Sequence, residues 1–120
     1  MAATILVLED NAPVSLLIEE ELLNAGFAVA GPFALCTRAL AFLETATPDA
    51  AILDVMLKDG CCHPVVEELK RRGVPFVIYS GRLRTEPAWS SFADAPWIDK
   101  PAPPHSLIQG VQTLLVAKAA

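Results

Sequence analysis

The sequence predicts an open α/β fold in which five parallel strands alternate with helices that cover both faces of the sheet. Short apolar runs alternate along the 120-residue chain with longer amphipathic segments, a pattern typical of a parallel sheet buried between two helical layers. Polar residues end or directly follow four of these runs, at Glu9-Asp10, Asp54, Ser80 and Lys100. Because open α/β sheets bind ligands at the carboxyl ends of their strands, these residues also predict a site.

The strands are expected where short apolar runs are rich in strand-forming residues. The runs are Thr4–Leu8, Ala28–Ala30, Ala50–Asp54, Val74–Ser80 and Trp97–Asp99. The composition marks no internal boundary and no long linker, so one domain is expected over residues 1–120.

The first three helices have recognisable ends. Asn11 can cap the first helix, and Gly26 fits the left-handed stop after it. The second helix is expected to end at Pro48. The third is expected to begin near Pro64, where a missing N–H does no harm, and to close at Gly73.

The last two helices differ in how clearly they are marked. The region from Arg82 to Pro96 contains Pro87 and lacks a clean 3.6-residue stripe, so a short or irregular fourth helix is expected. The fifth helix follows Pro103 and Pro104 and has a clear apolar stripe. That stripe consists of Leu107, Ile108, Val111, Leu114 and Leu115.

The composition excludes several classes of protein. A net charge of -5 with few and dispersed basic residues argues against a nucleic-acid surface. The apolar runs are too short to span a bilayer. An odd count of 3 cysteines makes a disulfide framework implausible. We therefore expect a cytoplasmic protein that binds neither nucleic acid nor membrane.

The carboxylates at the expected sheet edge predict a cation site. Asp54 closes an apolar run and is followed by another, and ionised groups next to a core are usually paired or metal-bound. If Glu9, Asp10 and Asp54 meet, a hard cation would relieve their repulsion. Mg²⁺ fits best because it leaves room for a phosphoryl group, and Mn²⁺ is expected to substitute.

The remaining residues at this edge suit phosphoryl chemistry. Asp54 is the candidate nucleophile, while Lys100 and Ser80 can hold phosphoryl oxygens. Each residue also has a simpler interpretation as part of a solvated turn, a helix cap or a surface ion pair with Asp99. Their joint occurrence at four strand ends favours a functional site.

These residues resemble those of a response regulator receiver domain, the phosphoacceptor module of two-component signalling. The markers are Glu9-Asp10, the stretch Ile52–Gly60, Ser80-Gly81 and Lys100-Pro101. The resemblance covers the whole chain. It implies a flavodoxin-like (βα)5 fold with the strand order 2-1-3-4-5.

The resemblance also implies roles for individual residues. Asp54 would accept a phosphoryl group from a histidine kinase or a histidine phosphotransfer protein. Asp10, Asp54 and the backbone carbonyl of Met56 would ligate Mg²⁺, and Glu9 would help through a water molecule. Lys100 and Ser80 would stabilise the phosphoryl group. Such a domain catalyses only its own phosphorylation and dephosphorylation, so no further enzyme activity is expected.

A switch and a tuning site are implied as well. Ser80 would turn inward after phosphorylation, and an aromatic residue would fill the vacated space. Trp97 is the candidate for that residue, with Tyr79 assisting. Met56 and Arg82 occupy the positions that tune the phosphoryl lifetime in such domains. The Lys100-Pro101 peptide is expected to be cis.

The chain departs from the family pattern after Lys100-Pro101. Ala102 and Pro103 stand where receivers commonly have a phenylalanine and an acidic helix cap. The family pattern therefore does not predict which surface of this chain contacts its downstream partner. We expect a free-standing receiver, although the chain could equally be a domain of a longer protein. It is expected to be a monomer or weak dimer that acts on an unidentified downstream protein.

Other classes remain as alternatives. One is an interaction module of the same fold that is no longer phosphorylated. A Mg-dependent phosphatase is disfavoured because the usual Asp-x-Asp motif after the first strand is missing. A flavodoxin-like ligand-binding domain would need a Gly- or Ser-rich first loop, whereas Glu9-Asp10-Asn11 would repel a phosphate there.

Overall fold

The computed structural model of the chain describes residues 2–82 and 95–119. Five parallel strands form the main sheet, in the order β2-β1-β3-β6-β7. They are β1 (Thr4–Leu8), β2 (Ala28–Phe33), β3 (Ala50–Leu53), β6 (Phe76–Ser80) and β7 (Trp97–Asp99). The short strands β4 (Met56–Leu57) and β5 (Gly60–Cys61) pair only with each other. Without this hairpin the sheet strands run 2-1-3-4-5, which confirms the predicted fold class and order.

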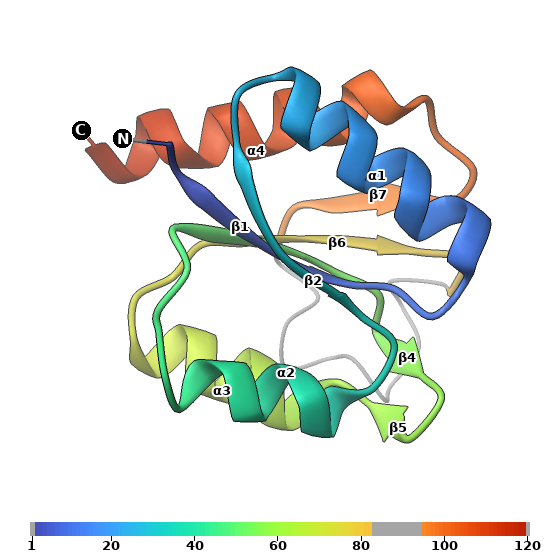
Figure 1. Cartoon of the computed structure of the whole chain (residues 1–120), viewed down its shortest axis with the longest axis vertical. Coiled ribbons are helices and arrows are strands. Elements are labelled where there is room, and N and C mark those ends of the chain that lie inside the picture. The colour runs from blue at the N-terminus through green and yellow to red at the C-terminus, as the bar shows by residue number, and fades with distance from the viewer. Residues whose placement is uncertain (1, 83–94, 120) are drawn as a thin grey trace.

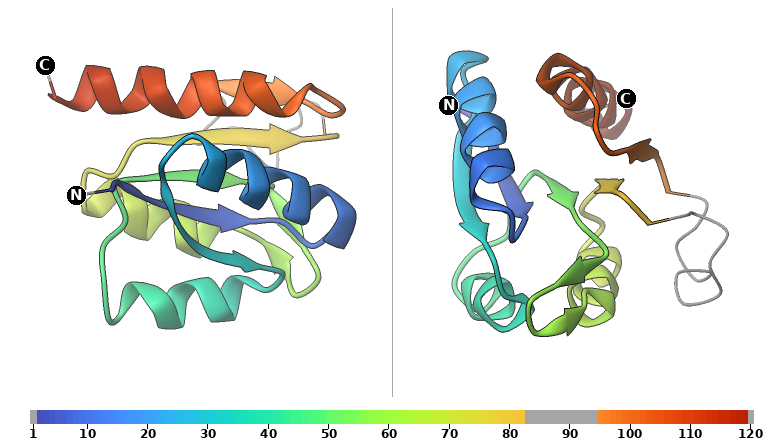
Figure 2. Two further views of the ribbon diagram at one scale, coloured as in Figure 1. Left: turned by 45° about the horizontal axis from the view of Figure 1, so that its top comes forward. Right: turned by 90° about the vertical axis from the view of Figure 1, so that its right-hand side faces the viewer.

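Helices cover both faces of the sheet, as Figures 1 and 2 show. On one face lie α1 (Ala12–Asn24) and α4 (Pro104–Ala119), and on the other lie α2 (Cys36–Leu43) and α3 (His63–Arg71). The predicted irregular fourth helix falls mostly on residues 83–94, outside the described residues. None of the described helices has the length and apolar character needed to span a bilayer.

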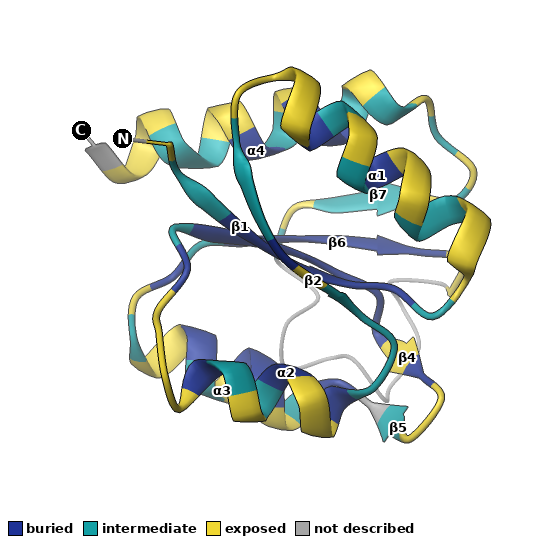
Figure 3. Cartoon of the chain, in the orientation of Figure 1, coloured by how far each residue is buried: buried dark blue, intermediate teal, exposed yellow. Residues whose placement is uncertain are grey.

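Alternating side chains of the strands divide the core into two halves. Along β1, Ile5 and Val7 face α1 and α4, whereas Leu6 and Leu8 face α2 and α3. Every residue of β3 is buried, as expected for a central parallel strand covered on both faces (Figure 3). Each fully buried Ile or Leu side chain contributes about 1.5–3 kcal/mol, so the core holds the strand ends in fixed positions.

The local signals at the helix ends are largely confirmed. Asn11 Oδ1 accepts a hydrogen bond of 3.2 Å from the Val14 N–H and caps α1. Gly26 follows α1 with a positive φ of 92°, a conformation that favours glycine. Pro64 lies in the first turn of α3, where it was expected. The predicted end of α2 was too late, because the helix stops at Leu43 and a turn follows.

Three strand boundaries differ from the sequence-based expectation. Strand β2 continues to Phe33, because a shift in its register with β1 carries it past Gly31, which adopts a positive φ of 98°. Strand β3 ends at Leu53, so Asp54 lies just beyond it. Strand β6 begins at Phe76, two residues after the expected Val74. The β4–β5 hairpin was not predicted.

Candidate functional site

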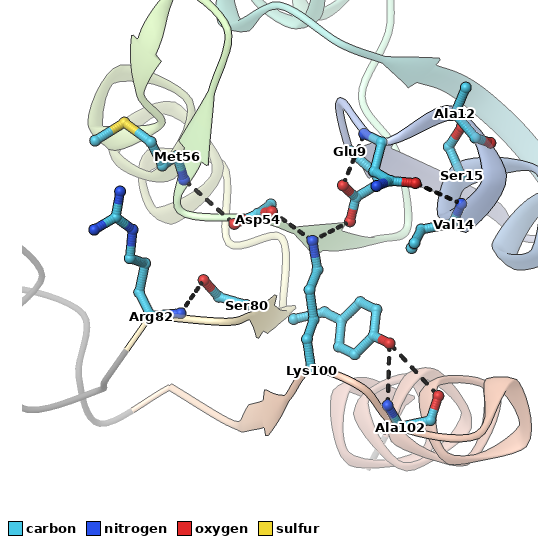
Figure 4. A network of polar contacts seen from close by, with 12 residues as sticks. Glu9, Ala12, Val14, Ser15, Asp54, Met56, Ser80, Arg82, Lys100 and Ala102 are labelled. Atoms are coloured by element: carbon cyan, nitrogen blue, oxygen red, sulfur yellow. Dashed lines mark hydrogen bonds and ion pairs between the residues drawn. The ribbon is translucent and has the colours of Figure 1, made fainter.

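The sheet register brings the predicted site residues to one edge. Leu8 pairs with Leu53, so the residues that follow β1 and β3 emerge side by side. Ser80 pairs with Asp99, which places Lys100 just beyond the end of β6. The site therefore lies at the carboxyl ends of four strands, as predicted (Figure 4).

Three carboxylates meet at this edge. Glu9, Asp10 and Asp54 each offer an oxygen atom, and these atoms lie within 4.8 Å of one another. Glu9 and Asp54 are buried, with 3% and 8% of their surfaces exposed. Hard cations such as Mg²⁺ prefer carboxylate and carbonyl oxygens, so this set of donors fits a divalent cation.

Lys100 supplies positive charge to the same cluster. Its Nζ atom lies 2.7 Å from Glu9 Oε1 and 2.7 Å from Asp54 Oδ2, so one ammonium group bridges two buried carboxylates (Figure 4). Burial alone would lower the pKa of Lys100, but the hydrogen bonds to Asp54 and Glu9 outweigh it, and the pKa lies above its usual value. Lys100 is therefore charged at neutral pH.

Glu9 is held rigidly by the backbone around it. Its Oε2 atom accepts a hydrogen bond of 3.0 Å from the Asn11 N–H, and its own N–H donates to the Phe33 carbonyl at 3.0 Å. Burial raises the pKa of Glu9, although the bonds from Lys100 and the Asn11 N–H oppose this effect. The raised pKa shows that burial of this carboxylate is only partly compensated by its partners.

Asp54 faces an open hollow beside the sheet. Its N–H donates to the Leu8 carbonyl at 3.0 Å, and its Oδ1 lies 3.4 Å from the Met56 nitrogen, which donates a long hydrogen bond. A cavity of about 470 Å³ is lined by Asp54, Met56, Ser80, Gly81 and Arg82. The phosphoacceptor candidate and both predicted tuning residues thus border the same space.

Ser80 is completely buried at the end of β6. Its Oγ accepts a hydrogen bond of 3.1 Å from the Arg82 N–H, and its carbonyl accepts one of 3.0 Å from the Lys100 N–H. The serine therefore connects the loop that carries Arg82 with the strand end that carries Lys100.

The two aromatic residues of the predicted switch lie on opposite faces of the sheet. Trp97 packs against the α2–α3 half of the core, and its buried Nε1 has no hydrogen-bond partner among the described residues. Tyr79 is buried in the α1–α4 half. The structure therefore brings neither residue into contact with the other, and their roles in switching remain predictions.

Tyr79 has a contact that sequence reasoning missed. Its hydroxyl accepts a hydrogen bond of 3.2 Å from the Ala102 N–H and lies 3.5 Å from the Ala102 carbonyl. Lys100 Nζ lies 5.5 Å from the centre of the Tyr79 ring. The peptide between Lys100 and Pro101 is cis, as predicted, and a second cis peptide joins Gly31 and Pro32.

Asp59 was also missed as a structural residue. Its carboxylate accepts hydrogen bonds from the N–H groups of Cys36 and Thr37, at the start of α2. These bonds lower the pKa of Asp59. Leu35 precedes α2, and its apolar side chain cannot cap the helix. This was the one sign in the sequence that a residue from elsewhere in the chain would supply the cap.

No protein-family model and no curated protein matches this sequence. Solved structures match it over nearly its whole length. SdrG from Sphingomonas melonis is 32% identical over 95% of this chain and 97% of its own, with a TM-score of 0.80. A response regulator receiver protein from Sinorhizobium medicae is 28% identical over 97% of this chain and 96% of its own, with a TM-score of 0.84.

A third structure supports the fold alone. A CheY-like response regulator receiver domain protein from Methanospirillum hungatei is 23% identical over 99% of this chain and 98% of its own, with a TM-score of 0.88. The described elements thus follow the architecture of these proteins from β1 to α4.

Proposed function

Because the chain belongs to the response regulator receiver domains, we propose that it is a phosphoacceptor in a two-component or phosphorelay pathway and that Asp54 is phosphorylated. One observation carries this proposal. Asp54 lies among three clustered carboxylates, with Lys100 Nζ 2.7 Å from its Oδ2 and a cavity beside it. A buried carboxylate with a cation on one side and open space on another can receive a phosphoryl group.

The reaction requires little covalent work from the protein. An oxygen of the Asp54 carboxylate attacks the donor phosphorus, and a new P–O bond forms. The P–N bond of a phosphohistidine breaks at the same time, or the P–O bond of acetyl phosphate. The electron pair of the broken bond leaves with the imidazole or with acetate. Positioning and charge stabilisation account for most of the acceleration in such transfers.

A divalent cation fits the carboxylate cluster. Asp10, Asp54 and the backbone carbonyl of Met56 would hold Mg²⁺, and Glu9 would contact it through a water molecule. When bound, Mg²⁺ neutralises charge on the phosphoryl oxygens. Mn²⁺ offers a similar preference for oxygen ligands and is expected to substitute.

Lys100 and Ser80 would bind the transferred group. The ammonium of Lys100 already contacts the Asp54 oxygen at 2.7 Å, so only a short movement is needed to reach a phosphoryl oxygen. Ser80 Oγ accepts a bond from the Arg82 N–H and lines the same cavity as Asp54. Its hydroxyl proton would be donated to the phosphoryl group.

A change in the hydrogen-bond partner of Ser80 would transmit the signal. A shift of Ser80 toward the phosphoryl group would change its contact with the Arg82 N–H and thereby the backbone at Gly81 and Arg82. Trp97, which pairs with Ile78 on the neighbouring strand, would respond on one face of the sheet, and Tyr79 would respond on the other. The switched surface would then recognise a downstream protein.

The partners follow from this role. The donor would be a histidine kinase or a histidine phosphotransfer protein in the cytoplasm, and the receiver would act as a monomer or weak dimer. Receiver domains are signalling modules, and the only chemistry proposed for this one is its own phosphorylation and dephosphorylation.

Phosphorylation by a small donor tests the proposal directly. Incubation with Mg²⁺ and acetyl phosphate should add one base-labile phosphoryl group, detected by intact mass. The Asp54→Asn variant should remain unmodified. Asp99→Asn, at an exposed aspartate of the same sheet edge, is the matched control and should be modified normally.

Two results would contradict the proposal. Failure of the wild-type protein to form the adduct would favour an interaction module of the same fold. Sustained release of inorganic phosphate, with turnover well beyond one equivalent, would favour a phosphatase.

A further inference from the structure

The hairpin that follows Asp54 is fastened to the start of α2 by a single side chain. Asp59 lies in the turn between β4 and β5. Its Oδ1 accepts a hydrogen bond of 2.8 Å from the Cys36 N–H, and its Oδ2 accepts one of 3.1 Å from the Thr37 N–H. Both partners lie in the first turn of α2, which Figure 1 shows beside the hairpin.

This contact takes the place of a local helix cap. The first N–H groups of a helix have no partner within the helix and carry partial positive charge. Leu35, at the position before α2, makes no side-chain cap bond. A carboxylate that arrives from a remote part of the chain satisfies two of these groups at once, so α2 and the hairpin hold each other in place.

The hairpin transmits this anchoring to Met56. Met56 pairs with Cys61, and Leu57, which is buried, pairs with Gly60. A second contact joins the two elements, since Cys36 Sγ lies 3.8 Å from the Gly60 carbonyl oxygen. At the base of the hairpin the Cys62 N–H donates to the Val55 carbonyl at 3.0 Å. The backbone of Met56 is therefore fixed from both ends of the hairpin.

We propose that Asp59 is a positioning residue for the metal site, which it serves by holding the Met56 carbonyl in place. The inference rests on the proposed function, in which that carbonyl is a ligand of the cation. Asp59 would not itself be a ligand of the cation, because both of its carboxylate oxygens accept hydrogen bonds from α2. Loss of a residue that orients a metal ligand typically lowers metal affinity by about 10- to 100-fold.

The arrangement also couples the metal site to α2. If Asp59 links the two, Mg²⁺ binding must strengthen the contact between Asp59 and α2 by the same factor by which that contact strengthens Mg²⁺ binding. Mg²⁺ should therefore slow hydrogen exchange at the amides of Cys36 and Thr37 in the wild-type protein.

Calorimetric titration with Mg²⁺ alone tests the role of Asp59. We expect Asp59→Ala to weaken Mg²⁺ binding by about tenfold, the low end for residues that orient metal ligands. Asp59→Asn keeps an oxygen acceptor for α2 and should lose less affinity. Lys58→Ala, at the exposed neighbouring position, should bind Mg²⁺ as the wild type does.

A second control separates positioning from a general loss of stability. Glu68→Gln removes the carboxylate that pairs with Arg71 and Arg72 at the end of α3, and it should leave Mg²⁺ affinity unchanged. If Asp59→Ala does not fold, Asp59→Asn and the exchange experiment on the wild-type protein decide the question. Normal Mg²⁺ binding by a folded Asp59→Ala variant, or no effect of Mg²⁺ on the Cys36 and Thr37 amides, would overturn the inference.

These outcomes remain distinct from failure of the proposed function. Wild-type protein that neither binds Mg²⁺ nor is phosphorylated would contradict both proposals. Wild-type protein that is phosphorylated on Asp54, with Mg²⁺ affinity unchanged in Asp59→Ala, would contradict only the role of Asp59.

Discussion

Lys100 Nζ lies 2.7 Å from Asp54 Oδ2, although β6 separates the strands that these residues follow. The long lysine side chain crosses the end of β6 and reaches Glu9 as well, at 2.7 Å. The Lys100 ammonium group therefore balances the charge of two buried carboxylates, and the stability of this sheet edge depends on it.

Replacing Lys100 with methionine should destabilise the protein while keeping most of the apolar stem. Loss of a hydrogen bond to a charged group costs about 1.5–3 kcal/mol, and here Glu9 and Asp54 would also repel each other. Added Mg²⁺ should restore more stability to Lys100→Met than to the wild type, because it supplies the missing positive charge. Urea unfolding with and without Mg²⁺ measures both effects.

The control for this variant is Lys58→Met, at an exposed lysine of the hairpin. It should unfold like the wild type and respond to Mg²⁺ equally. A Lys100→Met protein as stable as the wild type without Mg²⁺ would show that the bridging contact contributes no net stability.

Acid should destabilise the protein partly through Glu68. The carboxylate accepts hydrogen bonds from Arg71 and Arg72, and these bonds lower the pKa of Glu68 to about 2 from 4.5. Arg72 in turn donates to the Ala46 carbonyl at 3.2 Å and to Thr47 Oγ1 at 2.9 Å. Through Arg72, Glu68 therefore ties the end of α3 to the loop before β3.

The lowered pKa of Glu68 sets the direction in which stability changes with pH. The folded state holds Glu68 ionised more strongly than the unfolded chain does, so its contribution is fully present above pH 4.5 and disappears as the pH falls toward 2. Glu68→Gln should therefore reduce the loss of unfolding free energy across this window. Equal slopes for both proteins, measured by urea unfolding at several pH values, would contradict the assignment.

Removing the Tyr79 hydroxyl should loosen the segment after Lys100. Pro101 and Pro103 lack N–H groups, and the Ala102 N–H between them donates to Tyr79 at 3.2 Å. Tyr79→Phe should lower the unfolding free energy by about 0.5–1.5 kcal/mol, the usual contribution of one buried hydrogen bond.

The same variant tests whether this contact positions Lys100. If the entire free energy of the lost hydrogen bond raised the barrier to phosphorylation, the rate with acetyl phosphate would fall by at most about tenfold. Tyr79→Leu, which also removes the ring beneath Lys100 Nζ, should be slower still. Unchanged rates in both variants would restrict Tyr79 to a role in packing.

Sequence reasoning succeeded where the signal was local. The uninterrupted apolar run Thr4–Leu8 is observed as strand β1, and Asn11 forms the cap that its side chain predicts. The clustering of the acidic residues with Lys100 required the order of the strands, which came from the family resemblance. The periodicity of the apolar residues does not contain that order.

The missed features depend on contacts between remote segments. Each strand of the β4–β5 hairpin has only two residues, too few to show a period, and Asp59 caps a helix that begins 23 residues earlier. The faces of Tyr79 and Trp97 also needed the register, in which Trp97 pairs with Ile78 and shares its side of the sheet. Tyr79 follows Ile78 in β6 and therefore points to the other side of the sheet.

Arg82 should prolong the life of the phosphoryl group on Asp54. Its side chain lines the cavity beside Asp54 together with Met56, and its N–H is held by Ser80 Oγ at 3.1 Å. A bulky cation at this position hinders a water molecule approaching the phosphorus from the cavity side. Arg82→Ala should therefore lose the phosphoryl group faster, by up to about tenfold, which corresponds to about 1.4 kcal/mol in the barrier.

The decay of phosphorylated protein after removal of acetyl phosphate measures this lifetime. Arg82→Lys keeps the charge in a smaller head group, and Met56→Ala removes bulk without a change of charge, so the pair separates the two effects. If shielding by size dominates, Met56→Ala and Arg82→Lys should both decay faster than the wild type. If charge dominates, both should decay nearly as slowly as the wild type. Slower decay in Arg82→Ala than in the wild type would refute the shielding role, because the arginine would then be assisting hydrolysis.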